Sequence, residues 1–164
     1  RPDLGELTIA YPAEWVATEV QGGQVEIASS NAALMLMVSP ETTLGPGDVV
    51  GQVSLFTDAE TINNTTLDAL GDPSDTLLAI VGAFNFDNVL AADAEATTND
   101  TVTSVQGSIS IDEATTRTIR FYLVPVNDGA VFAYFTTEDE IGLRLLDDVV
   151  DDMLRTVVVV TDAP

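Results

Sequence analysis

Apolar and polar residues alternate with a period of two along the start of the chain, a pattern typical of strands with one buried face. It predicts strands over Leu7–Tyr11 and Trp15–Val20, the second followed by a return strand over Gln24–Ile27. Gly22-Gly23 supplies the residues of a hairpin turn between them. Leu34–Val38 is continuously apolar, which predicts a strand covered on both faces.

The middle of the chain carries turn and helix signals instead of alternation. Residues 41–52 contain three glycines and a proline, which predicts a loop with one helical turn. Residues 63–66 are a cap sequence for a short helix that runs to Gly71. Asp72-Pro73 then starts a second helix, with apolar residues at helical spacing as far as Phe84.

Period-two alternation returns in the second half. We expect a weakly patterned strand over 89–98 and clearer ones over 105–111 and 119–124. A turn at Asn127-Asp128-Gly129 leads into a further strand at Phe132–Phe135.

The last long element is an amphipathic helix. Thr137 and Glu140 have the spacing of a capping box, and Arg155 suits the helix end. One apolar stripe follows the helix: Ile141, Leu145, Leu146, Val149, Val150, Met153 and Leu154. Residues 157–160 predict a final strand. The elements together predict an α+β fold, a central antiparallel sheet flanked by helices in an α/β/α sandwich, with residues 1–164 as one domain.

The opening segment Leu7-Thr8-Ile9-Ala10-Tyr11-Pro12-Ala13-Glu14-Trp15, followed by a hairpin, a helical middle, long strands and a last helix, resembles the Mog1/PsbP-like superfamily. The resemblance implies an α/β/α sandwich and a non-catalytic docking protein. Members of that family bind a small GTPase, serve as extrinsic photosystem II subunits, or act as bacterial lipoproteins and secretion accessories. The resemblance assigns no binding residue to a position in this chain.

The amino-acid composition excludes several classes of catalytic and binding chemistry. The chain has 27 acidic residues against five arginines, a net charge of −22, and no lysine, histidine or cysteine. Serine–histidine and cysteine–histidine catalysis, thiol chemistry and the lysine of a phosphate-binding loop are thereby excluded. Paired carboxylates, as in glycoside hydrolysis, are the catalytic route left open. Nucleic-acid binding is not expected, because it depends on clustered basic residues.

The setting is inferred from composition and from the first residues. No apolar run reaches the length of about 20 residues needed to cross a membrane. Arg1-Pro2-Asp3 contains no initiator methionine, so we expect an exported, extracellular or cell-surface protein whose signal or anchor segment is not in this chain. The acidity is explained equally by a saline habitat or by the ordinary acidity of exported bacterial domains.

Two charged groups are candidate sites. Asp147, Asp148, Asp151 and Asp152 form two pairs spaced i,i+4 on the last helix, and carboxylate oxygens are the ligands that calcium prefers. The alternative is a solvated helix face, partly neutralised by Arg144 and Arg155. Arg117 and Arg120 fall on opposite faces of one strand, where either could be structural, buried against a carboxylate, or bind an anion.

Three glycosylation sequons begin at Asn63, Asn64 and Asn99. No catalytic, cofactor-binding or metal residue is assigned, and no cofactor is expected. The primary interpretation is a non-catalytic extracytoplasmic domain that binds a protein partner. The alternative is a calcium- or ligand-binding surface domain that uses its clustered carboxylates.

Overall fold

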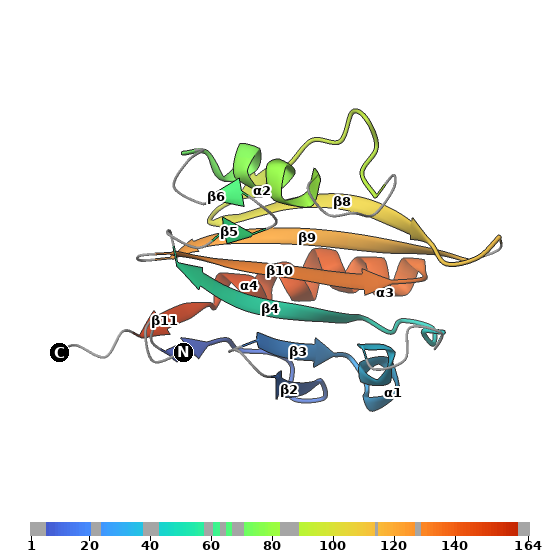
Figure 1. The fold of residues 1–164 in the computed structure, drawn as a ribbon. Helices are drawn as coiled ribbons and strands as arrows, with labels where there is room; N and C mark the ends of the chain where they lie inside the picture. Colours follow the sequence, from blue (N-terminus) through green and yellow to red (C-terminus); the bar gives the residue numbers. More distant parts are fainter. Residues whose placement is uncertain are drawn as a thin grey trace.

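Seven antiparallel strands form the main sheet, in the order β2-β3-β4-β10-β9-β8-β7 (Figure 1). The computed structural model describes residues 6–20, 24–37, 43–57, 61–62, 65–66, 71–82, 89–113, 115–126 and 129–160. The strands of this sheet are β2 (Val16–Val20), β3 (Gln24–Ala28), β4 (Val50–Thr57), β7 (Thr97–Asn99), β8 (Val102–Ser110), β9 (Thr116–Val126) and β10 (Gly129–Thr137). Two small ladders accompany it: β1 (Glu6–Thr8) with β11 (Val158–Val160), and β5 (Thr61–Ile62) with β6 (Thr65–Thr66).

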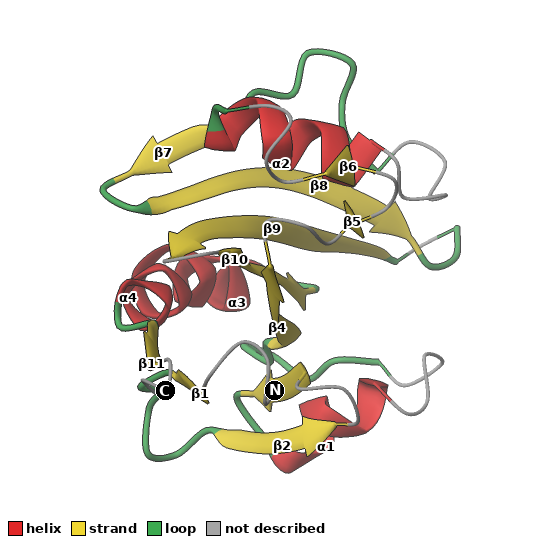
Figure 2. Ribbon diagram, turned by 60° about the vertical axis from the view of Figure 1, so that its left-hand side comes forward, coloured by secondary structure: helices red, strands yellow, loops and turns green. Residues whose placement is uncertain are grey.

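Helices contact both faces of the main sheet. The helical elements are α1 (Asn31–Leu34), a 3-10 turn (Met35–Met37), α2 (Pro73–Gly82), α3 (Glu140–Leu145), a π-helical segment (Leu146–Val150) and α4 (Asp151–Arg155). Figure 2 shows α2 over β8, with α3 and α4 on the other side of the sheet. Accordingly, Leu77 and Ile80 of α2 share a core cluster with Phe121, whereas Leu146 and Leu154 share another with Tyr122. The α+β class expected from the sequence is confirmed.

The strand alternation in the second half is confirmed by burial. Ile119, Phe121 and Leu123 of β9 belong to the cluster under α2, and Tyr122 and Val124 belong to the cluster under the C-terminal helices. The hairpin of β2 and β3 is also present, with Val16 opposite Ala28. Its predicted turn at 22–23, like residues 127–128 of the second predicted turn, lies outside the described residues.

Helix α2 confirms the start predicted at Asp72-Pro73. Asp72 Oδ1 accepts hydrogen bonds from the backbone N–H groups of Ser74 (2.8 Å) and Asp75 (3.2 Å). The helix ends at Gly82, and predicted position Phe84 lies outside the described residues. A cap satisfied by an aspartate side chain is a local signal, which is why the sequence was sufficient here.

Two predicted elements in the first half are wrong, and a third lies mostly outside the described residues. The apolar run from Leu34 is not a strand, because Ser30 caps a short helix and Met35–Met37 continues it as a 3-10 turn. Residues 65–66, the second half of the predicted cap sequence, form strand β6, while 63–64 and the predicted helix over 67–70 lie outside the described residues. The loop predicted to reach Gln52 stops at Val49, because β4 begins at Val50 and pairs with both β3 and β10.

Two further predictions need correction. Residues 89–96 contain no strand, so the expected strand over 89–98 is reduced to β7. The last helix is capped by Asp139, whose Oδ1 accepts from the Gly142 N–H at 2.7 Å; Thr137 is the final residue of β10. Thr and Asp are both good caps, and strand pairing of Thr137 with Thr118 decides between them.

Candidate functional site

The aspartates of the last helix occupy separate settings instead of one acidic face. Asp147 Oδ1 lies 2.6 Å from a guanidinium nitrogen of Arg120, which projects from β9. Arg120 also donates to Gln106 Oε1 of β8 at 2.8 Å. The ion pair with Asp147 therefore links the last helix to the sheet. Because the Arg120 guanidinium already binds Asp147 and Gln106, it is not available as an anion-binding group.

Asp151 is turned toward the core. Its side chain is only 16% exposed, and its Oδ1 is buried without a hydrogen-bond partner in the described part of the chain. Desolvation by burial raises the pKa of Asp151 above its usual value, although Arg120 and Arg155 act to lower it. Burial also raises the pKa of Tyr122, whose hydroxyl donates to the Leu146 carbonyl at 3.4 Å.

Asp148 and Asp152 are the two exposed members of the cluster. Asp152 forms an ion pair with Arg155, three residues further along the helix, and its side chain is still 75% exposed. Asp148 has no hydrogen bond or ion pair within the described ranges, and Arg144 does not reach it. The π-helical segment explains the separation, since its wider turn shifts the faces that i,i+4 spacing would align.

The calcium alternative gains no support from this geometry. Among residues 6–160 as far as they are described, no group of three or more acidic side chains is placed to hold a metal ion. Calcium needs six to eight oxygen ligands, which usually come from a loop folded around the ion. Here one carboxylate is used by Arg120, one by Arg155, and one faces the core.

Arg117 confirms the expectation of an arginine buried against a carboxylate. Its Nε lies 2.6 Å from Glu138 Oε1, with side chains only 7% and 14% exposed. It lies on the α2 face of β9, opposite to Arg120, as predicted. A buried charge so paired is structural: it joins β9 to the residues that precede α3.

Of the three sequons, one falls among the described residues. Asn99 is the last residue of β7 and is exposed, and Asp100 next to it adopts a positive φ of 62° in the turn to β8. Asn63 and Asn64 lie outside the described residues.

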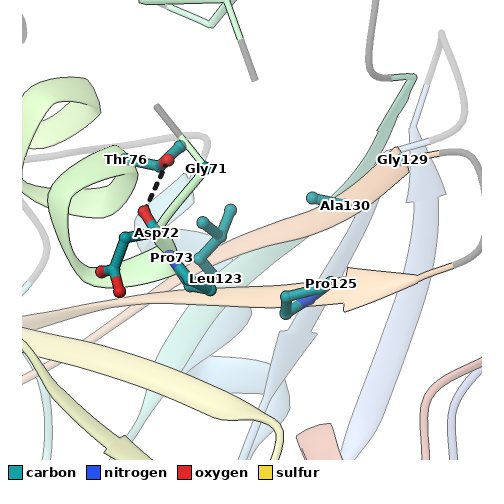
Figure 3. A pocket seen from close by; sticks show the side chains of 8 residues that line it. All are labelled: Gly71, Asp72, Pro73, Thr76, Leu123, Pro125, Gly129 and Ala130. Atoms are coloured by element: carbon teal, nitrogen blue, oxygen red, sulfur yellow. Dashed lines mark hydrogen bonds between the residues drawn. The ribbon is translucent and has the colours of Figure 1, made fainter. Parts of the chain in front are cut away.

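The described surface includes three hollows of note. The first, of about 160 Å³, lies at the start of α2, and Figure 3 shows Pro73 and Thr76 of the helix on one side and Leu123, Pro125 and Ala130 of the sheet on the other. Its only charged lining residue, Asp72, is used as the helix cap. The second is a largely apolar pocket of about 210 Å³ near Met37, Ile109 and Arg117.

The third hollow, which we call the Tyr11 groove, has a volume of about 310 Å³. It is lined by Ala10, Tyr11, Pro12, Asp148, Val149, Asp152, Met153 and Thr156. It joins the Tyr-Pro-x-x-Trp segment to the last helix. Its two carboxylates are exposed, whereas the acid of a glycoside hydrolase is sheltered so that it stays protonated. The groove has the chemistry of a binding surface.

The fold is similar to that of solved proteins, although no protein-family model and no characterised protein matches the sequence. The Ran-binding protein Mog1p of Saccharomyces cerevisiae superposes with a TM-score of 0.59 at 12% identity, over 93% of this chain and 89% of that chain. A point mutant of Mog1 gives a TM-score of 0.54 at 12% identity, over 95% and 92%.

A protein of Bacteroides thetaiotaomicron is also similar, with a TM-score of 0.53 at 12% identity over 95% of this chain. The present chain spans about half of that protein, 46% of its length. At this level of identity the similarity concerns the fold alone. The chain has a fold similar to that of Mog1, as the resemblance of the opening segment implied.

The described part of the chain contains no helix with the length and hydropathy to cross a membrane.

Proposed function

We propose that residues 1–164 form one Mog1/PsbP-like domain that binds another protein without catalysing a reaction. The observation that carries this proposal is the similarity to Ran-binding Mog1p, which extends over 93% of one chain and 89% of the other. The similarity therefore extends over nearly all of both chains and is not limited to a shared hairpin or helix pair. Because a fold can carry many functions, the identity of the partner is a separate question.

The chemistry of the described residues supports binding over catalysis. Asp147 and Glu138 are held by arginines, and Asp139 by two backbone N–H groups. Without histidine, lysine or cysteine, a reaction near neutral pH would need two carboxylates sheltered in one cleft. The hollows described above do not place such a pair.

An extracytoplasmic setting is part of the proposal. The net charge of −22, with five arginines and no lysine, supports it, because such acidity is ordinary among exported bacterial domains. Fractionation of source cells with an antibody to this chain tests the setting. Recovery in the surface or medium fraction is expected, and recovery with cytoplasmic markers would contradict it.

The binding function is tested by cross-linking the tagged chain in its source cells, identifying the adduct and purifying both proteins. We expect saturable binding of the purified pair with a fixed stoichiometry in titration calorimetry. The proposal fails if no adduct binds saturably after purification. It also fails if the chain alone turns over a glycoside or ester substrate at a rate that depends on its own carboxylates.

A further inference from the structure

The Tyr11 groove combines an apolar floor with an acidic rim. Tyr11 is 44% exposed and lines the groove together with Pro12, so its side chain is accessible to a ligand. Val149 and Met153, one helical turn apart, line the groove from the last helix. Asp148 and Asp152 lie one residue before each of them and are both exposed. Apolar and carboxylate groups therefore alternate along one wall.

The walls of the groove are held in place before any partner arrives. The Thr156 hydroxyl accepts from the Ala10 N–H at 2.9 Å and donates to the Met153 carbonyl at 2.7 Å, so it ties the Tyr11 segment to the helix. The Trp15 N–H donates to the Pro12 carbonyl at 3.0 Å, and the Trp15 side chain is buried in the core. A rigid groove loses little conformational entropy on binding.

The charged residues around the Tyr11 groove favour a basic ligand. No basic residue lines the groove, and the Asp148 carboxylate has no partner within the described ranges. Asp152 pairs with Arg155, and its side chain nevertheless remains 75% exposed. An aromatic face next to carboxylates attracts a guanidinium or ammonium group through cation–π and ionic interactions together. A net charge of −22 over the whole chain also accelerates the approach of a basic partner.

We propose that the Tyr11 groove binds a basic segment of the partner protein, with an arginine or lysine side chain against the Tyr11 ring and the carboxylates of Asp148 and Asp152. An apolar side chain next to that residue packs on the half-buried Val149 and on the small part of Met153 that lines the groove. This inference rests on the proposed binding function and adds to it the chemistry of the partner. It also gives the Tyr-Pro-x-x-Trp segment a role besides packing.

The test is a titration with a synthetic twelve-residue peptide of alternating arginine and leucine, at about 0.15 M salt so that long-range attraction is screened. The first variant carries Asp148→Asn and Asp152→Asn. The matched control carries Asp93→Asn and Glu95→Gln, which removes the same charge from two exposed positions outside the groove. Tyr11→Ala and Tyr11→Phe test the aromatic face. Thermal melts of all variants verify that each is folded.

We expect the groove variant to bind the peptide at least tenfold more weakly and the control variant to stay within twofold. Tyr11→Ala should weaken binding, and Tyr11→Phe should retain it, because the ring face is kept. Backbone amide shifts on titration should concentrate at the groove residues. The proposal is overturned if both charge variants lose affinity equally, since attraction would then be general, or if the peptide does not bind.

The purified natural partner separates this proposal from the one on which it rests. If the partner binds the wild-type chain and the groove variant equally, the groove assignment is wrong and the binding function stands. If no protein binds the wild-type chain saturably, the binding function itself fails.

Discussion

Asp139 connects two segments that are distant in sequence. Its Oδ1 caps the last helix at the Gly142 N–H, and its Oδ2 accepts from the Gly47 N–H at 2.7 Å, in the loop before β4. These two backbone hydrogen bonds lower the pKa of Asp139 below its usual value, the bond to Gly142 contributing most. One side chain thus positions both the helix and the loop that precedes a central strand.

Asp139→Ala should lower the free energy of unfolding at pH 7 by about 1–2 kcal/mol, the usual cost of losing a helix cap. Because the folded-state pKa is depressed, the ionised form stabilises the fold above pH 3.8, and this contribution is lost as the pH falls further. The gap between wild type and variant, measured by urea unfolding, should therefore close in acid. Asp139→Asn, which keeps one acceptor, should lose less; equal stability of wild type and the alanine variant would contradict the assignment.

Asp151 should behave in the opposite way. Its pKa is raised in the folded state, chiefly by desolvation, so its ionised form opposes folding at neutral pH. Stability should rise as the pH falls from the raised folded-state pKa toward 3.8. Asp151→Asn should raise the melting temperature at pH 7, with a gain below about 1 kcal/mol because Arg120 and Arg155 offset part of the desolvation of the carboxylate. The gain should vanish below pH 3.8, and a lower melting temperature at pH 7 would contradict this account.

At the scale of elements, β4 depends on a residue without a side chain. Gly51 lies opposite Phe135 of β10, and a Cβ there would overlap the Tyr134 carbonyl oxygen and the Phe135 ring. β4 occupies the position between β3 and β10, so any displacement would separate the two halves of the main sheet. Close approach of backbones at a glycine is a tertiary requirement.

Gly51→Ala should therefore cost about 3 kcal/mol or more, because backbone and a core ring must move. Gly82→Ala is the matched control, since a Cβ at the end of α2 meets no atom of the described residues within 4 Å. The control should be neutral or stabilising by about 0.5–1 kcal/mol, the helix preference of alanine over glycine. Chemical denaturation of both variants decides the matter, and similar stabilities would remove the role given to Gly51.

At the scale of the whole molecule, the net charge of −22 dominates the response to solvent. Repulsion between exposed carboxylates opposes the compact state, and salt shortens its range from about 30 Å at 0.01 M to about 3 Å at 1 M. The melting temperature should therefore rise by several degrees between low and high sodium chloride. Millimolar calcium at matched ionic strength should add nothing, whereas a calcium-specific rise would establish a metal site by mass action.

Local signals in the sequence were sufficient to predict many of the helices and strands of this protein. The alternation along β8, β9 and β10, the proline-started helix α2 and the stripe under the last helix predicted these elements and the α+β class. The buried pairing of an arginine on β9 with a carboxylate was also predictable, because a charge within an apolar strand needs a partner. Hydrophobic period and helix caps act over a few residues, so a sequence displays them directly.

The elements and side-chain environments that the sequence did not predict depend on contacts between distant segments. β4 was missed because its central place follows from pairing with β3 and β10, and the run from Leu34 became helical because Ser30 caps it and Asp48 holds the Ser30 hydroxyl at 2.8 Å. The four aspartates looked like one acidic face, yet a π-helical turn and Arg120 of β9 gave each a different environment. The Tyr11 groove is joined from segments near residues 11 and 150. Composition by itself determined which chemistries this chain lacks, while folding alone decided which of its many carboxylates remain free to meet a partner.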